Sequence, residues 1–224
     1  MIKQKELLAY VLPMALFLAL LALNAALKGA GDSFWLRSAE YWIYPLQTLV
    51  CGLLLLWFRR EYSLRPPARW IFGLGTGLLV FVLWIAPQSF LGFSARLDGF
   101  NPEQFAGQPA LYGVTVALRF LRLAVVVPFV EEIFWRGFLL RFLINEDFER
   151  VAFGAFSWFS FVVVTLAFGF SHNRPDWLAA LLTGALYNIV AYRSKSLSTC
   201  ILTHAVTNLL LGFWIMKTGQ WGFW

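Results

Sequence analysis

The sequence predicts an all-α membrane protein, a polytopic bundle of seven or eight transmembrane helices. Of its 224 residues, 60% are hydrophobic and only 13% are charged, whereas soluble domains average about 25% charged residues. The apolar residues also form uncharged stretches that are long enough to cross a hydrocarbon core of about 30 Å. This composition excludes a water-soluble globule and an intrinsically disordered chain.

The first predicted span covers residues 7–27, which contain no charged residue and follow Lys3 and Lys5. It exceeds the apolar core of a secretory signal, which has roughly 7 to 15 residues, so we predict a retained helix. Further apolar stretches predict spans at residues 41–58, 70–90, 151–171, 177–192 and 197–216.

The segment 111–143 would be about 50 Å long as one helix, which is longer than the membrane core. We predict a break at Pro128, because its ring removes an amide donor and clashes with the preceding turn. Residues 92–110 are rich in Gly, Pro, Asn and Gln and predict a polar loop. The chain then divides into N-terminal helices with this loop (1–110), a helical core (111–216) and a short tail (217–224).

The distribution of basic residues predicts the partners and the orientation. The net charge is +6, but the basic residues are scattered among apolar stretches, which favours membrane lipid over nucleic acid as the partner. Four arginines lie between the second and third spans and, with the N-terminal lysines, they predict a cytoplasmic N-terminus. They are Arg59, Arg60, Arg65 and Arg69.

Two adjacent carboxylates, Glu131 and Glu132, lie in an apolar run, where a charged side chain costs roughly 2.5 to 3.5 kcal/mol. Glu132 and Arg136 are four residues apart, so they share a helix face and are expected to form an ion pair. Glu131 points about 100° away and has no basic partner on its own helix. We therefore predict that Glu132 is structural and Glu131 is free. Alternatively, both carboxylates only neutralise the arginines of a buried network, namely Arg119, Arg122 and Arg136.

The two histidines of the chain, His172 and His204, both adjoin apolar stretches. Asn208 lies one turn after His204 and shares its face. Imidazole, carboxylate and carboxamide groups supply a base, a proton shuttle and oxyanion donors, which general acid/base hydrolysis requires.

Three motifs follow one another in the chain: Glu131-Glu132-x-x-x-Arg136, Phe168-x-x-x-His172 and His204-x-x-x-Asn208. In this order they resemble the motifs of the CPBP intramembrane proteases, also called the Abi or CAAX-protease family, which is similar to the type II CAAX prenyl endopeptidase. The first hundred residues resemble the CAAX-protease-related branch that accompanies bacterial exosortase systems. The resemblance implies an intramembrane endopeptidase, a multi-pass protein of the bacterial cytoplasmic membrane, that cuts a membrane-anchored or lipidated peptide.

The resemblance also implies roles for these residues. Glu131 and His172 would activate a water molecule, and His204 and Asn208 would stabilise the oxyanion. Structural support would come from Glu132, Arg136 and Phe168. This mechanism needs no cofactor.

Two expectations concern the environment of Glu131. A helix starting at Pro128 would place Glu131 in its first turns, where the helix dipole favours a carboxylate. We also expect the catalytic cavity to open towards the loop from Arg141 to Arg150 and the peptide to be cut near the cytoplasmic face.

Three alternatives stay open. The first is a zinc-dependent metalloprotease with Glu131, His172 and His204 as ligands and an open position for water, although the His-Glu-x-x-His signature is absent. The second is a proton-coupled transporter, which also uses intramembrane Glu and His residues but commonly shows repeated halves. The third is a non-catalytic membrane binding or immunity protein of the same fold.

Overall fold

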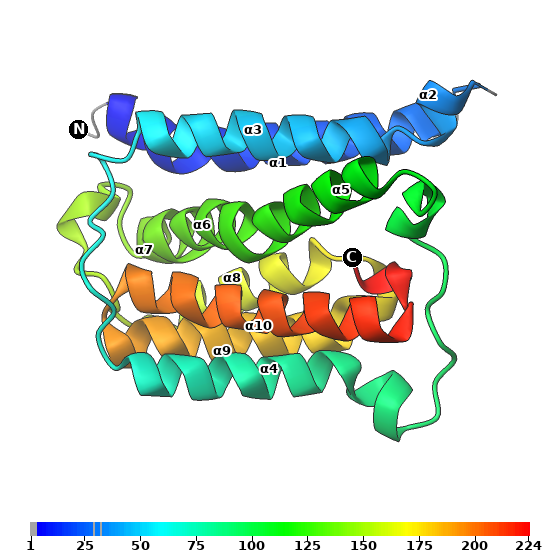
Figure 1. The fold of residues 1–224 in the computed structure, drawn as a ribbon. Helices are drawn as coiled ribbons and strands as arrows, with labels where there is room; N and C mark the ends of the chain where they lie inside the picture. The colour runs from blue at the N-terminus through cyan, green and yellow to red at the C-terminus, as the bar shows by residue number, and fades with distance from the viewer. Residues whose placement is uncertain (1–3, 29, 32) are drawn as a thin grey trace.

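The computed structural model describes residues 4–28, 30–31 and 33–224, which form helices and loops without any strand. Seven helical segments of this part run side by side in alternating directions (Figure 1). They are α1 (Gln4–Lys28), α3 (Glu40–Trp57), α4 (Trp70–Phe90), the continuous helix Pro109–Phe142, α8 (Trp158–Phe170), α9 (Trp177–Ser194) and α10 (Leu197–Thr218). Short helices in the connections are α2 (Phe34–Arg37), η1 (Pro102–Phe105), η4 (Phe148–Arg150), η5 (Arg174–Asp176) and η6 (Trp221–Phe223).

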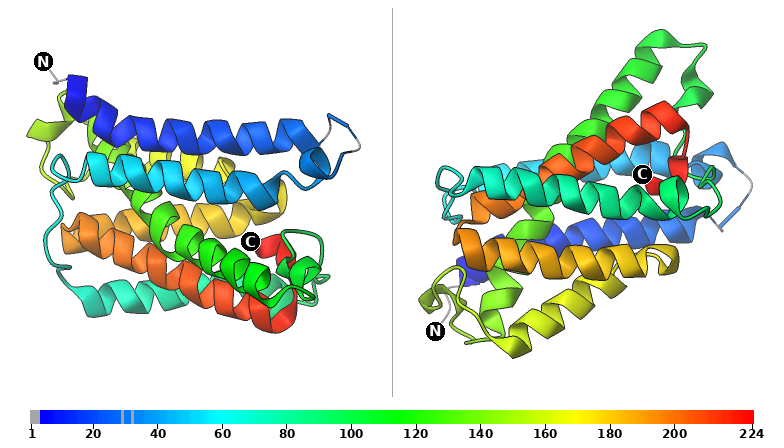
Figure 2. Two further views of the ribbon diagram at one scale, coloured as in Figure 1. Left: turned by 45° about the horizontal axis from the view of Figure 1, so that its top comes forward. Right: turned by 90° about the horizontal axis from the view of Figure 1, so that it is seen from below.

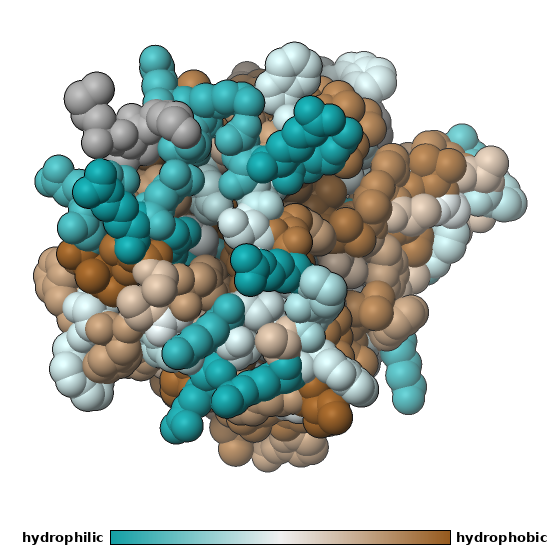
Figure 3. Space-filling view, turned by 90° about the vertical axis from the view of Figure 1, so that its left-hand side faces the viewer, coloured by the Kyte–Doolittle hydropathy of each residue, from teal (hydrophilic) through white to brown (hydrophobic). Residues whose placement is uncertain are grey.

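The surface of the bundle fits a lipid environment. In the described residues four helices are long and apolar enough to cross a membrane: Gln4–Lys28, Trp70–Phe90, Pro109–Phe142 and Leu197–Thr218. Large apolar side chains point outward along the sides, for example Leu53 and Trp57, which are 65% and 79% exposed. Figure 3 looks onto the end of the bundle near residue 4, where hydrophilic side chains gather between hydrophobic flanks. The predicted all-α membrane bundle is thus confirmed.

The helix Pro109–Phe142 does not break at Pro128, so that prediction is wrong. The chain relieves the proline within the helix by a π turn, η2 (Arg122–Val126), directly before α6 (Val127–Glu132). Val127 donates its amide to the Arg122 oxygen, five residues back, and the wider turn accommodates the missing donor and the ring. Glu131 therefore lies inside a continuous helix, and the expected dipole effect of a helix start does not apply.

The remaining parts of this long helix are α5 (Pro109–Leu121), a second π segment η3 (Ile133–Leu139) and α7 (Leu140–Phe142). Its 34 residues span about 51 Å. Figure 2 shows the green helix crossing the other helices obliquely, with its first turns extending beyond them.

Helix α8 is shorter than the predicted span 151–171. It begins at Trp158, where the side chain of Ser157 accepts the amide of Ser160, and it ends at Phe170. Its 13 residues cover about 20 Å, less than the membrane core. His172 lies two residues past this end and lines the same cavity as Glu131 of the long helix, which is described below.

Helices α4 and α10 pack closely because α4 presents glycines four residues apart. A Cβ atom on Gly77 would lie 2.7 Å from the Thr203 oxygen, and one on Gly73 would lie 2.9 Å from the Thr199 methyl group. Small residues at this spacing let two membrane helices approach. This contact fixes the position of α10, the helix that carries His204, against α4.

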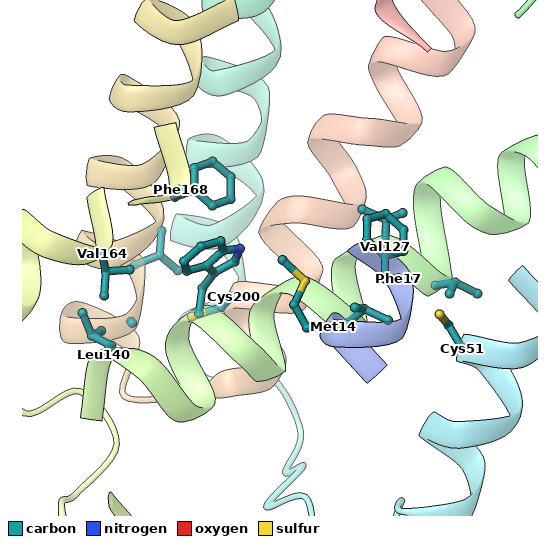
Figure 4. Packing of buried hydrophobic residues seen from close by; sticks show 13 residues of the cluster. Met14, Phe17, Cys51, Val127, Leu140, Val164, Phe168 and Cys200 are labelled. Carbon is teal, nitrogen blue, oxygen red and sulfur yellow. The ribbon is translucent and has the colours of Figure 1, made fainter. Parts of the chain in front are cut away.

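A hydrophobic cluster joins the N-terminal helices to the rest of the bundle (Figure 4). Met14 and Phe17 from α1 and Cys51 from α3 belong to the same cluster as Val127 of the long helix and Phe168 of α8. Cys51 and Cys200 are both free and buried. The cluster lies next to the cavity described below, which Met14, Phe17, Val127 and Phe168 also line.

Candidate active site

One cavity of about 420 Å³ brings together all four residues that the sequence suggests for catalysis. Glu131 comes from α6, His172 from the residues after α8, and His204 and Asn208 from α10. The three motifs are separated by tens of residues in the chain, so only the antiparallel arrangement of these helices brings them to one cavity.

Glu132 holds two partners with the same oxygen. Its Oε1 accepts from Arg136 NH1 at 3.0 Å, which is the predicted ion pair, and lies 2.9 Å from His204 Nδ1. Glu132 and Arg136 are fully buried. Because a carboxylate in an ion pair only accepts, His204 donates through Nδ1–H, and its Nε2 is left for the cavity. The sequence did not indicate the bond between Glu132 and His204.

Arg136 is anchored by groups beyond its carboxylate partner. Its Nε donates to Asn188 Oδ1 at 3.1 Å, and its NH2 donates to the Gly184 oxygen at 3.3 Å. The guanidinium carbon lies 4.8 Å from the centre of the Phe168 ring. Sequence reasoning missed Asn188, although a carboxamide within the apolar span 177–192 was a usable signal.

His172 has a fixed ring orientation. Its Nδ1 lies 2.8 Å from the main-chain oxygen of Phe168, one turn earlier. A carbonyl oxygen only accepts, so Nδ1 carries the hydrogen and the neutral ring keeps an unprotonated Nε2. The rings of Phe168 and Trp84 lie against the imidazole, with centroids 4.8 and 5.7 Å away. Phe168 therefore contacts both Arg136 and His172.

Asn208 is positioned by the irregular turn before Pro128. The Leu123 oxygen would ordinarily accept from Val127, but Val127 donates to Arg122. Five residues after Leu123, where a π turn would supply the donor, stands Pro128, which has no amide hydrogen. Asn208 Nδ2 donates to the Leu123 oxygen at 2.9 Å instead. Its second amide hydrogen remains available to the cavity.

Glu131 is half-buried and lines the cavity. In the part of the chain that the structure describes, no hydrogen bond or ion pair of its side chain occurs, in contrast to Glu132. The predicted network of both glutamates with three arginines is realised only for Glu132 and Arg136, because Arg119 and Arg122 make no ion pair within the described residues.

The residues suggested for zinc do not assemble as ligands. Across the described ranges, no three His, Cys, Asp or Glu side chains stand close enough to hold a metal ion. Each histidine donates Nδ1–H to a protein oxygen and keeps Nε2 free, as metal-ligating histidines also do. Their spacing is what differs, because Glu131, His172 and His204 do not form a three-ligand group in this geometry.

The cavity opens at the opposite end from the one expected. It is lined by residues near the far ends of α1 and α4 and by η5 and η6, including Asn24, Trp84, Asp176 and Trp224. None of the loop 141–150 lines it. Trp84 Nε1 donates to Thr183 Oγ1, and Tyr187 OH donates to Thr207 Oγ1, so a hydrogen-bonded wall of tryptophan, tyrosine and threonine surrounds His172 and His204.

Residues 113–210 match the family model described as type II CAAX prenyl endopeptidase Rce1-like. The match covers 98 of the 224 residues and supports a relationship of this helical core to the CPBP/CAAX protease family. The matched segment contains Glu131, His172, His204 and Asn208 and runs from α5 to α10. No curated protein and no solved structure matched the chain. The family match and the four candidate spans together support a membrane protein related to the CAAX proteases.

Proposed function

We propose that the chain is an intramembrane endopeptidase in which Glu131 and His172 activate water while His204 and Asn208 stabilise the oxyanion. The observation that carries this proposal is the single cavity lined by all four residues. The substrate is a membrane-anchored or lipidated peptide, and no metal takes part.

Hydrolysis begins when the water oxygen attacks the scissile carbonyl carbon. Glu131, whose carboxylate has no fixed partner, accepts one proton of the water. His172 orients the water by accepting its second hydrogen at Nε2, the nitrogen left free by the bond from Nδ1 to Phe168. The proton on Glu131 then passes to the leaving nitrogen as the C–N bond breaks, giving a carboxylic acid and an amine.

The oxyanion needs donors that are in place before the reaction. Asn208 supplies the amide hydrogen that Leu123 does not use. His204 already donates Nδ1–H to Glu132, so it donates to the oxyanion only as the imidazolium, through Nε2–H. Glu132 and Arg136 hold the ring in the required orientation.

The topology extends the proposal. More basic residues lie at the end of the bundle near residue 4 than at the other end, including Arg59, Arg65, Arg141 and Lys195, and this bias supports a cytoplasmic position for that end. The cavity opens at the other end, so the peptide is cut near the outer face of a bacterial cytoplasmic membrane.

The test is peptidase activity of the purified protein on a library of membrane-anchored peptides. Glu131→Gln keeps the volume of the side chain and removes the base. Turnover should therefore fall at least 1,000-fold, while the midpoint of thermal unfolding stays unchanged. Glu146→Gln, on an exposed loop residue, is the matched control and should keep full activity. Wild-type turnover in Glu131→Gln would show that this residue is not the base.

A further inference from the structure

Two arginines in the wall of the catalytic cavity are not used by the proposed hydrolysis. Arg119 and Arg122 lie on the long helix, are only 3% and 7% exposed, and line the same cavity as Glu131. Their guanidinium carbons are 4.6 and 4.5 Å from the centre of the Tyr44 ring. The two cations are thus held close together against one aromatic side chain.

Neither arginine makes an ion pair with another described residue, although Glu131 attracts Arg122 and Glu40 attracts Arg119 from beyond contact distance. Arg122 Nε donates to the neutral amide of Gln47 at 2.7 Å, and Arg119 Nε and NH1 have no hydrogen-bond partner. Two described carboxylates line the cavity: Asp176 is engaged by Arg96, and Glu131 makes no ion pair with either arginine. A guanidinium stays charged in proteins, and burying it without an anion is strongly unfavourable. This wall of the cavity therefore has room for an anion in direct contact with the two guanidinium groups.

The π turn aligns these arginines with Glu131. In a regular α-helix, residues 119 and 131 would point about 120° apart, but the extra residue of a π turn reduces the angle to about 20°. The same extra residue also reduces the angle between Arg122 and Glu131 around the helix axis, from about 180° to about 80°. Along the axis, Arg119 and Arg122 lie about 18 and 13 Å from Glu131.

We propose that Arg119 and Arg122 form a carboxylate-binding subsite for the substrate peptide, four to five residues from the scissile bond. The spacing follows from the axial distances, because an extended peptide covers about 3.4 Å per residue. The planar guanidinium fork matches a carboxylate in two-point geometry. The proposal rests on the proposed hydrolysis at Glu131 and adds a determinant of substrate choice. The carboxylate is either the C-terminal group of the peptide or an acidic side chain.

A peptide is favoured over a lipid headgroup because the subsite and Glu131 share one cavity. An extended chain can contact both, whereas a headgroup would leave Glu131 without a role in its binding. The membrane lipid is treated as the competing outcome of the test.

The experiment uses a peptide that the wild type cleaves, prepared with its C-terminus three to seven residues beyond the cut. Each length is made as the free acid and as the amide, and a second series carries internal Glu or Gln at the same positions. The ratio of kcat/KM for acid over amide, or Glu over Gln, should reach about 10-fold or more at four to five residues. The two series distinguish the C-terminal group from an acidic side chain.

Arg119→Met and Arg122→Met keep much of the side-chain volume and should each bring this ratio close to 1. Arg60→Met, at an exposed arginine outside the cavity, is the control and should leave the ratio unchanged. Both kcat/KM values of a ratio are measured on the same variant, so a partial loss of folded protein lowers both equally and leaves the ratio unchanged. A wild-type ratio of 1 at every length overturns the subsite without using any variant.

Binding of the same peptides to Glu131→Gln separates this proposal from the proposed function. Preferential binding of the acids without hydrolysis by any wild-type preparation would support the subsite and refute the protease. Hydrolysis with the same kcat/KM for the acid and the amide of every peptide would support the protease and refute the subsite. If the arginine variants lose only a preference for phosphatidylglycerol over phosphatidylcholine in nanodiscs, the anion is a lipid headgroup and the peptide subsite is refuted.

Discussion

Asn208 on α10 donates its side-chain N–H to the main-chain oxygen of Leu123 at 2.9 Å, although 85 residues separate them in the chain. The oxygen is free because the π turn redirects the Val127 amide and because Pro128 has no amide hydrogen. A proline inside the long helix thus orients a proposed oxyanion donor.

This relationship predicts an unusual effect of Pro128→Ala. The new amide competes with Asn208 for the Leu123 oxygen or regularises the turn, so kcat should fall about 10-fold while thermal stability stays equal or rises. Asn208→Ala should lose about 100-fold or more. Pro45→Ala, in α3, controls for loss of a helical proline. Unchanged kcat in Pro128→Ala would contradict the positioning role.

Glu132→Ala should lower stability as well as activity. It strands the buried charge of Arg136 and releases His204, and breaking a buried pair costs roughly 3 to 5 kcal/mol. Thermal unfolding in detergent should show a clear drop, in contrast to Glu131→Gln. Glu132→Gln, which still accepts hydrogen bonds, should be affected less. Equal thermal transitions for Glu132→Ala and wild type would refute the bracing role.

Chelation should leave activity unchanged. The proposed mechanism uses Glu131 and His172 as the water-activating groups, and elemental analysis of active protein should give less than one equivalent of metal. If activity disappears with a chelator and returns in proportion to added zinc, the metalloprotease alternative is correct.

Gly77→Ala should weaken the contact between α4 and α10. The added Cβ would lie 2.7 Å from the Thr203 oxygen, so α10 must shift next to His204, and both the thermal transition and kcat should fall. Gly75→Ala is the control on the same helix, because no atom lies within 4 Å of its new Cβ. Gly75→Ala should be neutral or stabilising by up to about 1 kcal/mol. Equal effects of the two variants would show that packing at Gly77 is not tight.

Cysteine labelling in sealed vesicles tests the orientation. Glu146→Cys and Arg174→Cys place exposed thiols at opposite ends of the bundle, while native Cys51 and Cys200 are buried and should not react. Glu146→Cys should be labelled from the cytoplasmic side and Arg174→Cys from the outer side. The reverse pattern would place the mouth of the cavity in the cytoplasm, and labelling of both from one side would contradict the fold.

The sequence alone determined the membrane class, the positions of most helices and the ion pair between Glu132 and Arg136. These properties depend on local features, namely long uncharged stretches and residues four apart on one helix face. The same locality made the motifs recognisable, because Glu131, His172, His204 and Asn208 each lie at fixed spacing from a neighbour.

Tertiary structure decided what depends on contacts between distant segments. Pro128 was expected to break its helix, but packing with α10 and a π turn keep the helix continuous and give the free Leu123 oxygen to Asn208. The partner of His204 and the direction in which the cavity opens likewise follow from the arrangement of the helices. Spacing along a helix fixes which residues share a face, whereas the rotation and depth of each helix in the bundle decide what that face meets.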